Sequence, residues 1–565
     1  MEKNKLRDVP LFDDLKGLLY HSAEVYKDKA AFIIKKTQGK DKVYVNKSYK
    51  EFLYDINCFG TALYSLRLAG KRVAVTGRNS YMWAVAHFAN LLGGMVSVPL
   101  DKELQVNELE DSLVRSEADA LIYDSKYEDK IEKIREKGAA TVKYYIPTEG
   151  EDEFAFDSIL AKGKALLDGG DTSFVDFAPD PDALAILLFT SGTTDKAKAV
   201  MLCQRGIACN ICDMQMVEDF RSTDTNIAFL PFHHIFGSTG LSVMLSCGVT
   251  TVFTDGLKYI KKNLGEYKVS LFIGVPVLID SMKSAVEKEV RKQGKEKLVA
   301  TMRKVTRILR KFGIDIRRKV FKQLIDGLGG HMRLIISGGA PLDPETMRFF
   351  DDIGVDIVQG YGLTETSPVI SAENEKFRRL GSVGIPMRRV EVKIDNPDSD
   401  GIGQIKVKGA IVMMGYYRNQ EATDAVLSDG WFNTGDLGYL DKDGFLFITG
   451  RQKDMIVLKN GKKIFPEEVE TLVNRIEGVK ESFIYGYSED GGISFDKIMC
   501  KAVYDSAVLK GSLKDIHDVI WNEIKEINKT LPMYKYIKGL TITDEPLIKT
   551  STNKIKRNEE IKTVM

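Results

Sequence analysis

Short apolar runs, many of them β-branched, alternate over residues 50–450 with longer stretches in which apolar residues recur at helical spacing. The clearest runs lie at 73–76, 95–98, 120–123, 185–189 and 271–273. Strands buried in a parallel sheet read as continuous apolar runs, and crossover helices join them. The pattern therefore predicts an α/β architecture with parallel sheets for most of the chain.

The pattern changes after Gly450. Pro466 is placed to begin a helix, because the fixed φ of proline suits the first helical turn. Apolar residues follow it at i, i+3, i+4 and i+7 spacing, at Val469, Leu472, Val473 and Ile476. A strand-like run at 483–485 comes next, so we expect a small α+β domain in this part of the chain.

The segment between the two patterns, residues 450–454, is polar and begins with glycine, which suits a connection that can move. We therefore predict a large multi-subdomain α/β N-terminal domain over residues 1–450 and a hinge at 451–453. A small mobile α+β C-terminal lid domain is predicted over 454–565.

Residues 282–323 are unusually basic, with fifteen arginines and lysines interleaved with leucine and valine. One interpretation is a pair of basic amphipathic helices that make peripheral contact with an anionic membrane. The other is a helical face covered by solvent, which is the commoner role of charge runs. Both interpretations stay open at this point.

Composition and charge narrow the class of protein. The chain has 565 residues, of which 44% are hydrophobic and 28% charged, and 81 basic residues balance 80 acidic ones. A formal charge of +1 gives no reason to expect a nucleic-acid partner. Charges at residues 2–8 stand where a signal peptide needs an apolar core, and no run approaches the ~18 apolar residues of a membrane span. We predict a cytoplasmic protein.

The six cysteines are scattered and show no disulfide framework. Cys209 and Cys212 form one CxxC pair in a stretch that reads as helix, without a second pair or a histidine at zinc-finger spacing. Reduced thiols without a metal or redox role are therefore expected.

The segment 187–198 carries the first chemical signal. An apolar strand runs into the hydroxyl- and glycine-rich sequence Thr190-Ser191-Gly192-Thr193-Thr194 and then into two lysines, Lys196 and Lys198. Backbone N–H groups and hydroxyls in such a loop can wrap phosphate oxygens while lysine supplies charge. The Gly-Lys-Ser/Thr of a Walker loop is absent, which disfavours an ordinary kinase or GTPase. Alone, the segment is weak evidence, since such clusters are most often just turns.

Two further segments complete a pattern. Residues 359–366 follow a strand-like run at 355–358, and Asn433-Thr434-Gly435-Asp436 follows a polar turn. With these motifs in this order, the chain resembles the adenylate-forming (AMP-binding) superfamily of acyl-CoA synthetases, adenylation domains and luciferases. The resemblance covers about residue 45 to the end and is strongest to the long-chain fatty acyl-CoA synthetase branch.

The resemblance implies an ATP-dependent acid–thiol ligase of fatty acid metabolism. Such an enzyme activates a carboxylic acid as acyl-AMP with release of pyrophosphate, and then transfers the acyl group to coenzyme A. A carboxylate that attacks an α-phosphate is one anion approaching another, which at ~4 Å in a low-dielectric cleft costs several kcal/mol. Lysine and magnesium (Mg2+) are the groups expected to offset that repulsion.

The resemblance also assigns a nucleotide site. The phosphate loop would hold the β- and γ-phosphates of ATP through Thr190, Ser191, Gly192, Thr193, Thr194 and Lys198. Gly338, Gly339 and Ala340 would flank adenine, and Tyr361, between Gly360 and Gly362, would stack on it. Asp436 would bind the ribose hydroxyls with help from Arg451.

The remaining assignments concern catalysis, and they too rest on the resemblance. Thr364 would contact the α-phosphate, and Glu365 and Thr190 would hold Mg2+. His234 would lie beside the substrate carboxylate, and Lys554 would reach into the site during adenylation. Lys453 matches the hinge position of the family, and Gly461 a loop that faces pantetheine.

The chain departs from the family pattern at Asp195, Ala197 and Ala199 in the phosphate loop and at Asn553 before the C-terminal lysine. Asp195 brings a carboxylate toward triphosphate, so a nucleotide- or acyl-binding homologue with impaired catalysis is one alternative. An acyl-AMP ligase that loads a carrier-protein thiol is another. The basic insert favours a medium- or long-chain fatty acid over an aryl acid, whereas chain length and oligomeric state do not follow from the sequence.

Overall fold

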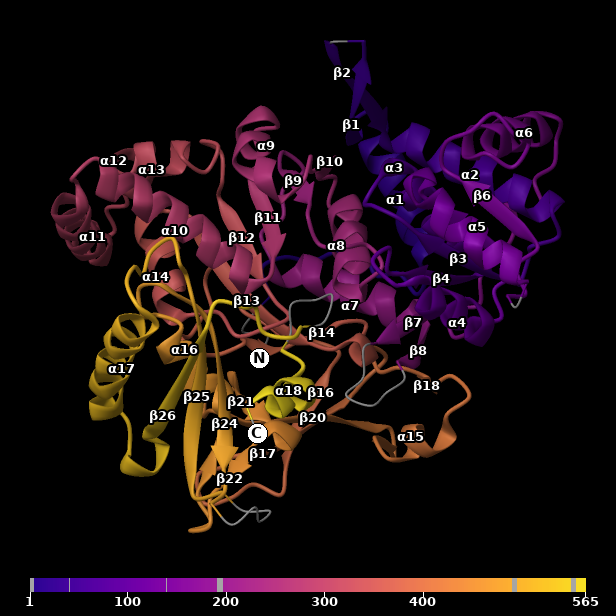
Figure 1. Cartoon of the computed structure of the whole chain (residues 1–565). Helices are drawn as coiled ribbons and strands as arrows, with labels where there is room; N and C mark the ends of the chain where they lie inside the picture. The colour runs from indigo at the N-terminus through magenta and orange to yellow at the C-terminus, as the bar shows by residue number, and fades with distance from the viewer. Residues whose placement is uncertain are drawn as a thin grey trace.

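The computed structural model describes residues 5–39, 41–138, 140–190, 197–489, 495–549 and 555–564. Figure 1 shows two large sheets, a third sheet below them and a separate C-terminal sheet with its own helices. The predicted α/β fold class, with a large multi-sheet part and a smaller α+β part, is confirmed.

The first large sheet has seven strands. Their order is β18 (Gly415–Tyr416), β8 (Lys198–Cys203), β7 (Leu184–Thr190), β4 (Val96–Leu100), β3 (Arg72–Thr76), β5 (Ala120–Tyr123) and β6 (Tyr144–Pro147). The strands from β7 to β6 are parallel, whereas β8 and β18 are antiparallel to their neighbours. The helices of this part are α2 (Tyr49–Ser65), α3 (Tyr81–Leu92), α4 (Val106–Ser116), α5 (Glu128–Lys137) and α6 (Phe156–Asp168).

The second large sheet has nine strands. Their order is β15 (Ile385–Pro386), β14 (Val369–Ala372), β13 (Asp356–Gly362), β12 (Leu334–Ser337), β11 (Leu271–Gly274), β9 (Thr225–Ala228), β10 (Thr250–Phe253), β1 (Ala30–Gln38) and β2 (Asp41–Ser48). Its helices are α1 (Leu15–Tyr26), α7 (Gln204–Val217), α8 (Ile235–Ser246), α9 (Ile260–Glu266), α10 (Pro276–Lys292), α11 (Glu296–Lys311), α12 (Arg317–Val320), α13 (Lys322–Asp326) and α14 (Pro344–Ile353).

One apolar core joins the two large sheets. It contains Val75 of β3, Leu241 of α8 and Ile336 of β12, each at most 4% exposed. Helices α7 and α8 lie between the sheets in Figure 1, which explains why both are buried on nearly every side. The CxxC pair lies in α7, where burial raises the pKa of Cys209 to about 12 and keeps the thiol protonated.

The third sheet is antiparallel and completes the large part. It contains β16 (Glu391–Asp395), β17 (Gly403–Lys408), β19 (Leu427–Ser428), β20 (Trp431–Leu440) and β21 (Leu446–Arg451), with the short helix α15 (Gln420–Asp424) beside it. Asp436 of β20 pairs in register with Arg451, the last residue of β21. Residues 452–454 then form a single 3-10 turn, so the predicted hinge begins at the end of a strand.

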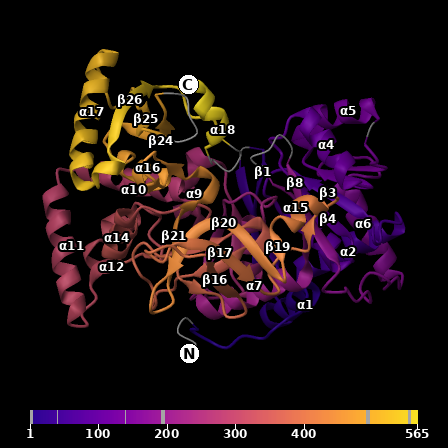
Figure 2. The same cartoon turned by 90° about the horizontal axis from the view of Figure 1, so that it is seen from below.

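The C-terminal part folds around a core of its own, which includes Val469, Ile498 and Ile520. Its strands are β24 (Val479–Tyr487), β25 (Lys497–Tyr504) and β26 (Ile537–Thr543), with a small hairpin of β22 (Ile456–Val457) and β23 (Lys463–Ile464). Its helices are α16 (Pro466–Val473), α17 (Leu513–Thr530) and α18 (Arg557–Glu560). Figures 1 and 2 both place it against one side of the large part, with α16 next to β21.

The predicted elements agree with these bounds to within a few residues. Strands expected at 73–76, 120–123 and 271–273 are β3, β5 and β11. The helix expected from Pro466 is shorter than its apolar spacing suggested: it ends at Val473, and Ile476 is buried in the turn that follows. Within the described ranges, none of the helices combines the length and apolar composition that crossing a bilayer requires.

Candidate functional site

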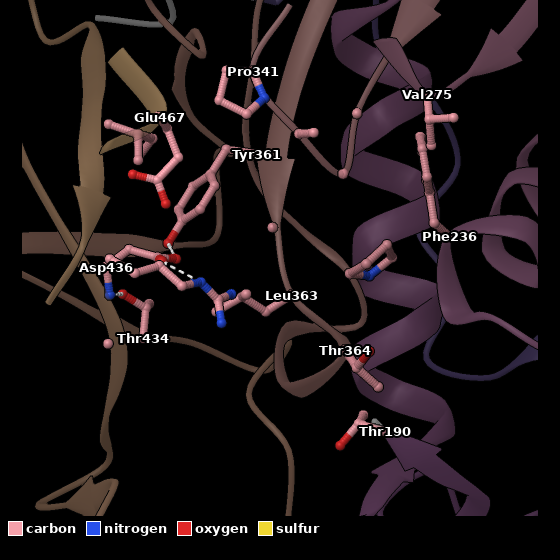
Figure 3. A pocket seen from close by; sticks show the side chains of 18 of the residues that line it. Thr190, Phe236, Val275, Pro341, Tyr361, Leu363, Thr364, Thr434, Asp436 and Glu467 are labelled. Carbon is pink, nitrogen blue, oxygen red and sulfur yellow. Dashed lines mark hydrogen bonds and ion pairs between the residues drawn. The ribbon is translucent and has the colours of Figure 1, made fainter. Parts of the chain in front are cut away.

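A cleft of about 3580 Å³ opens where the C-terminal ends of β9, β11, β12 and β13 face the third sheet and the C-terminal domain. Loops that follow parallel strands meet at one edge of a sheet, which is where α/β proteins bind ligands. Figure 3 shows side chains from several of these loops converging on the same space.

Two glycines at the end of β12 shape one wall of the cleft. A Cβ on Gly338 would stand 2.9 Å from the ring of Phe236, and Gly339 has φ +84°, a conformation that favours glycine. Ala340 and Pro341 follow and also line the cleft. The backbone here can approach a flat ligand closely, as the adenine assignment requires.

Strand β13 changes partner inside this wall. It pairs with β12 up to Gln359 and with β14 from Gly360 to Gly362. A Cβ on Gly362 would lie 1.8 Å from the carbonyl oxygen of Pro368, so only glycine fits there. Gly360 is under no such constraint, since its Cβ would meet its nearest neighbour at an ordinary 3.5 Å. The result is a strand end that carries Tyr361 into the cleft (Figure 3).

Tyr361, Asp436 and Arg451 form one group, joined by a hydrogen bond and an ion pair. The Tyr361 hydroxyl donates to Oδ2 of Asp436 at 2.6 Å, and Nε of Arg451 lies 3.1 Å from Oδ1 (Figure 3). Asp436 is 4% exposed, and its backbone N–H donates to the Thr434 hydroxyl. A carboxylate has about four acceptor positions, so two remain for ligand hydroxyls. The structure thus brings Tyr361, which the sequence assigned to adenine, together with the Asp436–Arg451 pair that it assigned to the ribose.

The environment of this group shifts the pKa values of Arg451 and Tyr361. Burial opposes the charge of Arg451, but Asp436 and Tyr361 outweigh it, and the pKa of the guanidinium is raised. Burial, reinforced by Asp436, raises the pKa of Tyr361 well above its usual range. Tyr361 therefore acts as a neutral hydrogen-bond donor at any physiological pH.

A second group lies at the phosphate end of the cleft. Oε1 of Glu365 accepts a hydrogen bond from the Tyr416 hydroxyl at 2.9 Å, and Nζ of Lys198 lies 4.7 Å from the centroid of the Tyr416 ring. Thr190 faces Lys198 across the β7–β8 hairpin and donates to its carbonyl oxygen. The turn that holds Thr364 and Glu365 packs against β8, and Figure 3 shows Thr190 and Thr364 at the same end of the cleft.

Sequence reasoning missed Tyr416, which bridges Glu365 and Lys198. The only sequence feature at this position is the Gly415-Tyr416 pair. Because β18 is two residues long, it shows no alternation of apolar and polar residues that would identify a strand. Glu365 presents its second oxygen, Oε2, without a hydrogen bond within the described residues, which leaves it for a ligand. The oxygen donors of Glu365 and Thr190 are of the type that Mg2+ prefers.

The altered positions of the phosphate loop are partly described. Ala199 is buried in β8 and pairs with Phe189, so alanine fits an ordinary strand position there. The carbonyl oxygen of Ala197 accepts a hydrogen bond from Arg115 at 2.7 Å. Ser191, Gly192, Thr193, Thr194 and Asp195 lie outside the described residues, as do Asn553 and Lys554.

His234 lies at the start of α8 and lines the cleft beside His233. The two imidazole rings are 4.2 Å apart, and Nε2 of the buried His233 is 3.5 Å from Oδ2 of Asp101. Donor atoms of these three side chains lie within 4.8 Å of one another, a grouping that includes neither predicted magnesium ligand.

The C-terminal domain supplies the opposite wall. Gly461, with φ +77°, and Lys453 both line the cleft, and burial lowers the pKa of Lys453. Arg557 binds Glu470 through two nitrogens at 2.9 and 2.6 Å and lies 3.4 Å from Glu467. Burial raises the pKa of Glu467 to about 7. Sequence reasoning identified neither Arg557 nor Glu467.

Ion pairs join the C-terminal domain to the large part. Arg475 binds both carboxylate oxygens of Asp343 at 3.0 and 2.7 Å, and Arg291 binds Glu477 at 2.7 Å. Asp343 also caps α14 by accepting the backbone N–H of Glu345. Arg475 lines the cleft, and both ion pairs are partly open to solvent.

Comparison with known proteins gives a consistent result. A family model described as AMP-binding enzyme matches residues 19–417, and one described as AMP-binding enzyme C-terminal domain matches residues 453–563. A long-chain-fatty-acid–CoA ligase of Mycobacterium bovis is 28% identical over 462 residues, covering 79% of this chain and 76% of that protein.

Two further comparisons concern the acceptor and the fold. A chloroplastic long-chain-fatty-acid–acyl-carrier-protein ligase of Arabidopsis thaliana is 27% identical over 541 residues, covering 82% of this chain and 73% of that protein. The crystal structure of an anthranilate CoA ligase in complex with anthranoyl-AMP superposes with a TM-score of 0.77 at 19% identity and covers 98% of both chains. At that identity the likeness concerns the fold.

Proposed function

The chain belongs to the AMP-binding enzyme family, and from this premise we propose that it is an ATP-dependent acid–thiol ligase. The substrate is a medium- or long-chain fatty acid, which is activated as acyl-AMP with release of pyrophosphate and then transferred to coenzyme A. The long-chain ligase named above supports the substrate class. The predicted cytoplasmic location stays a prediction.

The observation that carries the proposal is the Tyr361–Asp436–Arg451 group beside the close-approach glycines of β12 and β13. Asp436 retains acceptor positions for the two ribose hydroxyls, and Arg451 holds that carboxylate in place. Gly338, Gly339 and Ala340 leave room for the adenine ring against Tyr361. A buried acceptor with these neighbours discriminates a nucleoside from an apolar ligand.

The phosphates of ATP would extend from Thr364 toward Lys198. Glu365 and Thr190 would hold Mg2+, which when bound neutralises part of the phosphate charge. The Tyr416 hydroxyl fixes the orientation of Glu365, and Lys198 over the Tyr416 ring adds a positive charge at the same end. The remaining loop residues assigned to the phosphates are Ser191, Gly192, Thr193 and Thr194.

The acid would enter beside His234, which orients its carboxylate toward the α-phosphate. Lys554 would neutralise the approach of the two anions during adenylation. For the second half-reaction the C-terminal domain would turn about Lys453 and bring Gly461 to the pantetheine of coenzyme A. Different neighbours around one carbonyl then serve two successive reactions.

A carrier-protein thiol is the second candidate acceptor, because one relative, matched over 82% of this chain, is named an acyl-carrier-protein ligase. The experiment that separates the candidates is pyrophosphate release with a panel of acids, with and without coenzyme A, followed by detection of the thioester. Pyrophosphate release that requires no coenzyme A, with thioester only on a carrier protein, favours the second candidate. Absence of pyrophosphate release with every acid would overturn both and favour the catalytically impaired homologue.

A further inference from the structure

Helix α11 exposes more apolar side chains than a helix that only covers a core. Besides Val299 and Met302, which pack against the core, it has apolar side chains that face solvent and arginines that face the protein. Figures 1 and 2 both place it at the outer edge of the molecule, away from the C-terminal end of the chain. With 16 residues, it extends for about 24 Å at 1.5 Å per residue.

The arginines of α11 are used inside the protein. Arg303 and Arg307 both bind Asp352 of α14, with nitrogen–oxygen distances of 2.6–3.0 Å. Arg310 binds Asp351 at 2.7 Å. Three of the six basic residues of α11 are therefore paired with α14, and these pairs fasten the helix with a fixed orientation.

The opposite side of α11 exposes an apolar stripe. Leu298, Val305, Ile308 and Phe312 are 58%, 39%, 55% and 77% exposed, and their spacing of seven, three and four residues places them along one line. Ile314, just after the helix, is exposed as well. A contiguous apolar patch of this kind marks an interaction surface, because isolated apolar residues on a surface do not align at helical spacing.

A row of lysines follows one edge of this stripe. Lys297, Lys304 and Lys311 recur every seven residues, and none of the three makes an ion pair with any residue that the structure describes. The one acidic residue of α11, Glu296, is paired with Arg291 at 3.4 Å. The outward face of α11 is thus apolar along its middle and positive along its edge.

We propose that α11 is an interfacial helix that lies on an anionic lipid surface, with the apolar stripe at the headgroup boundary and the lysines on lipid phosphates. Exposed leucine, isoleucine and phenylalanine beside a lysine row are the pattern of helices that lie in the membrane plane. A second copy of this chain would bring two lysine rows together, which charge repulsion disfavours. The inference does not depend on the proposed enzymatic function.

The test uses the full chain and vesicles of phosphatidylcholine with or without phosphatidylglycerol, separated by centrifugation. The wild type is expected to bind the anionic vesicles at least tenfold more tightly than the neutral ones. The variant Leu298→Ser/Ile308→Ser/Phe312→Ser should lose at least tenfold of that affinity, because three apolar contacts are removed. The variant Lys297→Gln/Lys304→Gln/Lys311→Gln should lose about fivefold per lysine at low salt and less at high salt.

The matched control replaces exposed apolar residues of the C-terminal domain, Val508→Ser/Leu513→Ser/Val519→Ser. It should bind vesicles like the wild type, and unfolding midpoints of all variants should stay close together because the changed side chains are exposed. A wild type that ignores anionic vesicles, or an α11 variant that binds them as well as the control, overturns the proposal. A lipid-independent dimer that the apolar variant dissociates also overturns it and assigns the stripe to a second copy.

Discussion

The two walls of the cleft are built differently. On the large-domain wall, Asp436 of β20 is buried. It is held by Arg451 on the paired strand β21 and by Tyr361 on β13 of the nine-stranded sheet. On the rim, the C-terminal domain is held by ion pairs that water reaches, such as Arg475–Asp343 and Arg291–Glu477. Truncating one partner of a buried charged pair costs several kcal/mol, whereas an exposed pair contributes ~0–1 kcal/mol.

This difference suits two separate tasks: nucleotide binding for the first wall and the change between half-reactions for the second. The wall proposed to bind the nucleotide is preorganised, and the wall assigned to Lys453, Gly461 and Lys554 is joined to the large part at ion pairs that water reaches, as the proposed turning of this domain requires. A mutation in the first wall should affect both half-reactions, since both require the bound nucleotide or adenylate. A mutation in the second wall should affect one half-reaction at a time.

The largest effect is expected for Lys554→Ala. Adenylation should fall by about 10³-fold, because the positive charge is needed while carboxylate and α-phosphate approach. Thioester formation from supplied acyl-AMP should stay within about twofold of the wild type by the same reasoning. Each half-reaction is measured separately, and Lys538→Ala, an exposed lysine of the same domain, is the control. Equal losses in both steps would contradict the division between the walls.

The next effect is on nucleotide affinity. Asp436→Ala removes a buried acceptor and strands Arg451, so ATP binding should weaken by about 3 kcal/mol, close to 100-fold. Calorimetric titration with a nonhydrolysable ATP analogue measures it. Asp441→Ala, an aspartate on the next turn that pairs with Arg379, is a matched control. Unchanged affinity in Asp436→Ala would place the ribose elsewhere.

The pH dependence of stability probes the support of the first wall. Glu373 is fully buried next to Gln359, and burial raises its pKa to about 7. A carboxyl whose pKa is higher in the folded state stabilises the fold below its unfolded pKa and loses that contribution as pH rises through the folded pKa. From pH 4.5 to 7 the free energy of unfolding should therefore drop by up to about 3 kcal/mol. Glu373→Gln should flatten this decrease in urea titrations, and an unaltered slope would show that another group causes it.

A smaller effect is expected at the phosphate end. Tyr416→Phe removes the hydroxyl that orients Glu365, which should cost about 1 kcal/mol and raise the magnesium concentration for half-maximal adenylation about fivefold. Tyr417→Phe is the matched control, because the adjacent hydroxyl donates to Glu117 instead. A magnesium response identical in both variants would remove Tyr416 from the metal site.

The smallest effect is expected at the rim. Arg475→Ala breaks an exposed ion pair, so unfolding should change by less than about 1 kcal/mol. The ratio of the adenylation rate to the thioester rate should shift by about twofold, because one position of the C-terminal domain is favoured less. Arg348→Ala, whose partner Glu345 lies on the same helix, should leave that ratio unchanged. A shift in the control of equal size would exclude domain position as the cause.

The sequence was sufficient for features that depend on local patterns. Continuous apolar runs located β3, β5 and β11, and glycine-rich motifs located the ends of β12 and β13. It could not place Tyr416 or Arg557, because each acts through a partner distant in the chain, Glu365 or Glu470. Hydrophobic spacing alone does not predict such contacts between distant residues.

The basic segment 282–323 is a second case in which spacing in the sequence does not predict a contact with a distant residue. Helical spacing predicted amphipathic helices over 282–323, and α10 and α11 confirm two helices there. Spacing defines an apolar side and a charged side but not which of them meets the protein. Asp351 and Asp352 decide that for α11, and their role emerges only when α14 is packed beside it.

The Asp343 carboxylate accepts hydrogen bonds from two places at once, the first turn of α14 and the guanidinium of Arg475. If Arg475 moved away with the C-terminal domain, the Asp343 carboxylate would still accept the Glu345 N–H, so its charge would keep a donor on the large domain. If the C-terminal domain turns as proposed, Asp343 is therefore already held in place to pair with Arg475 again when the domain returns.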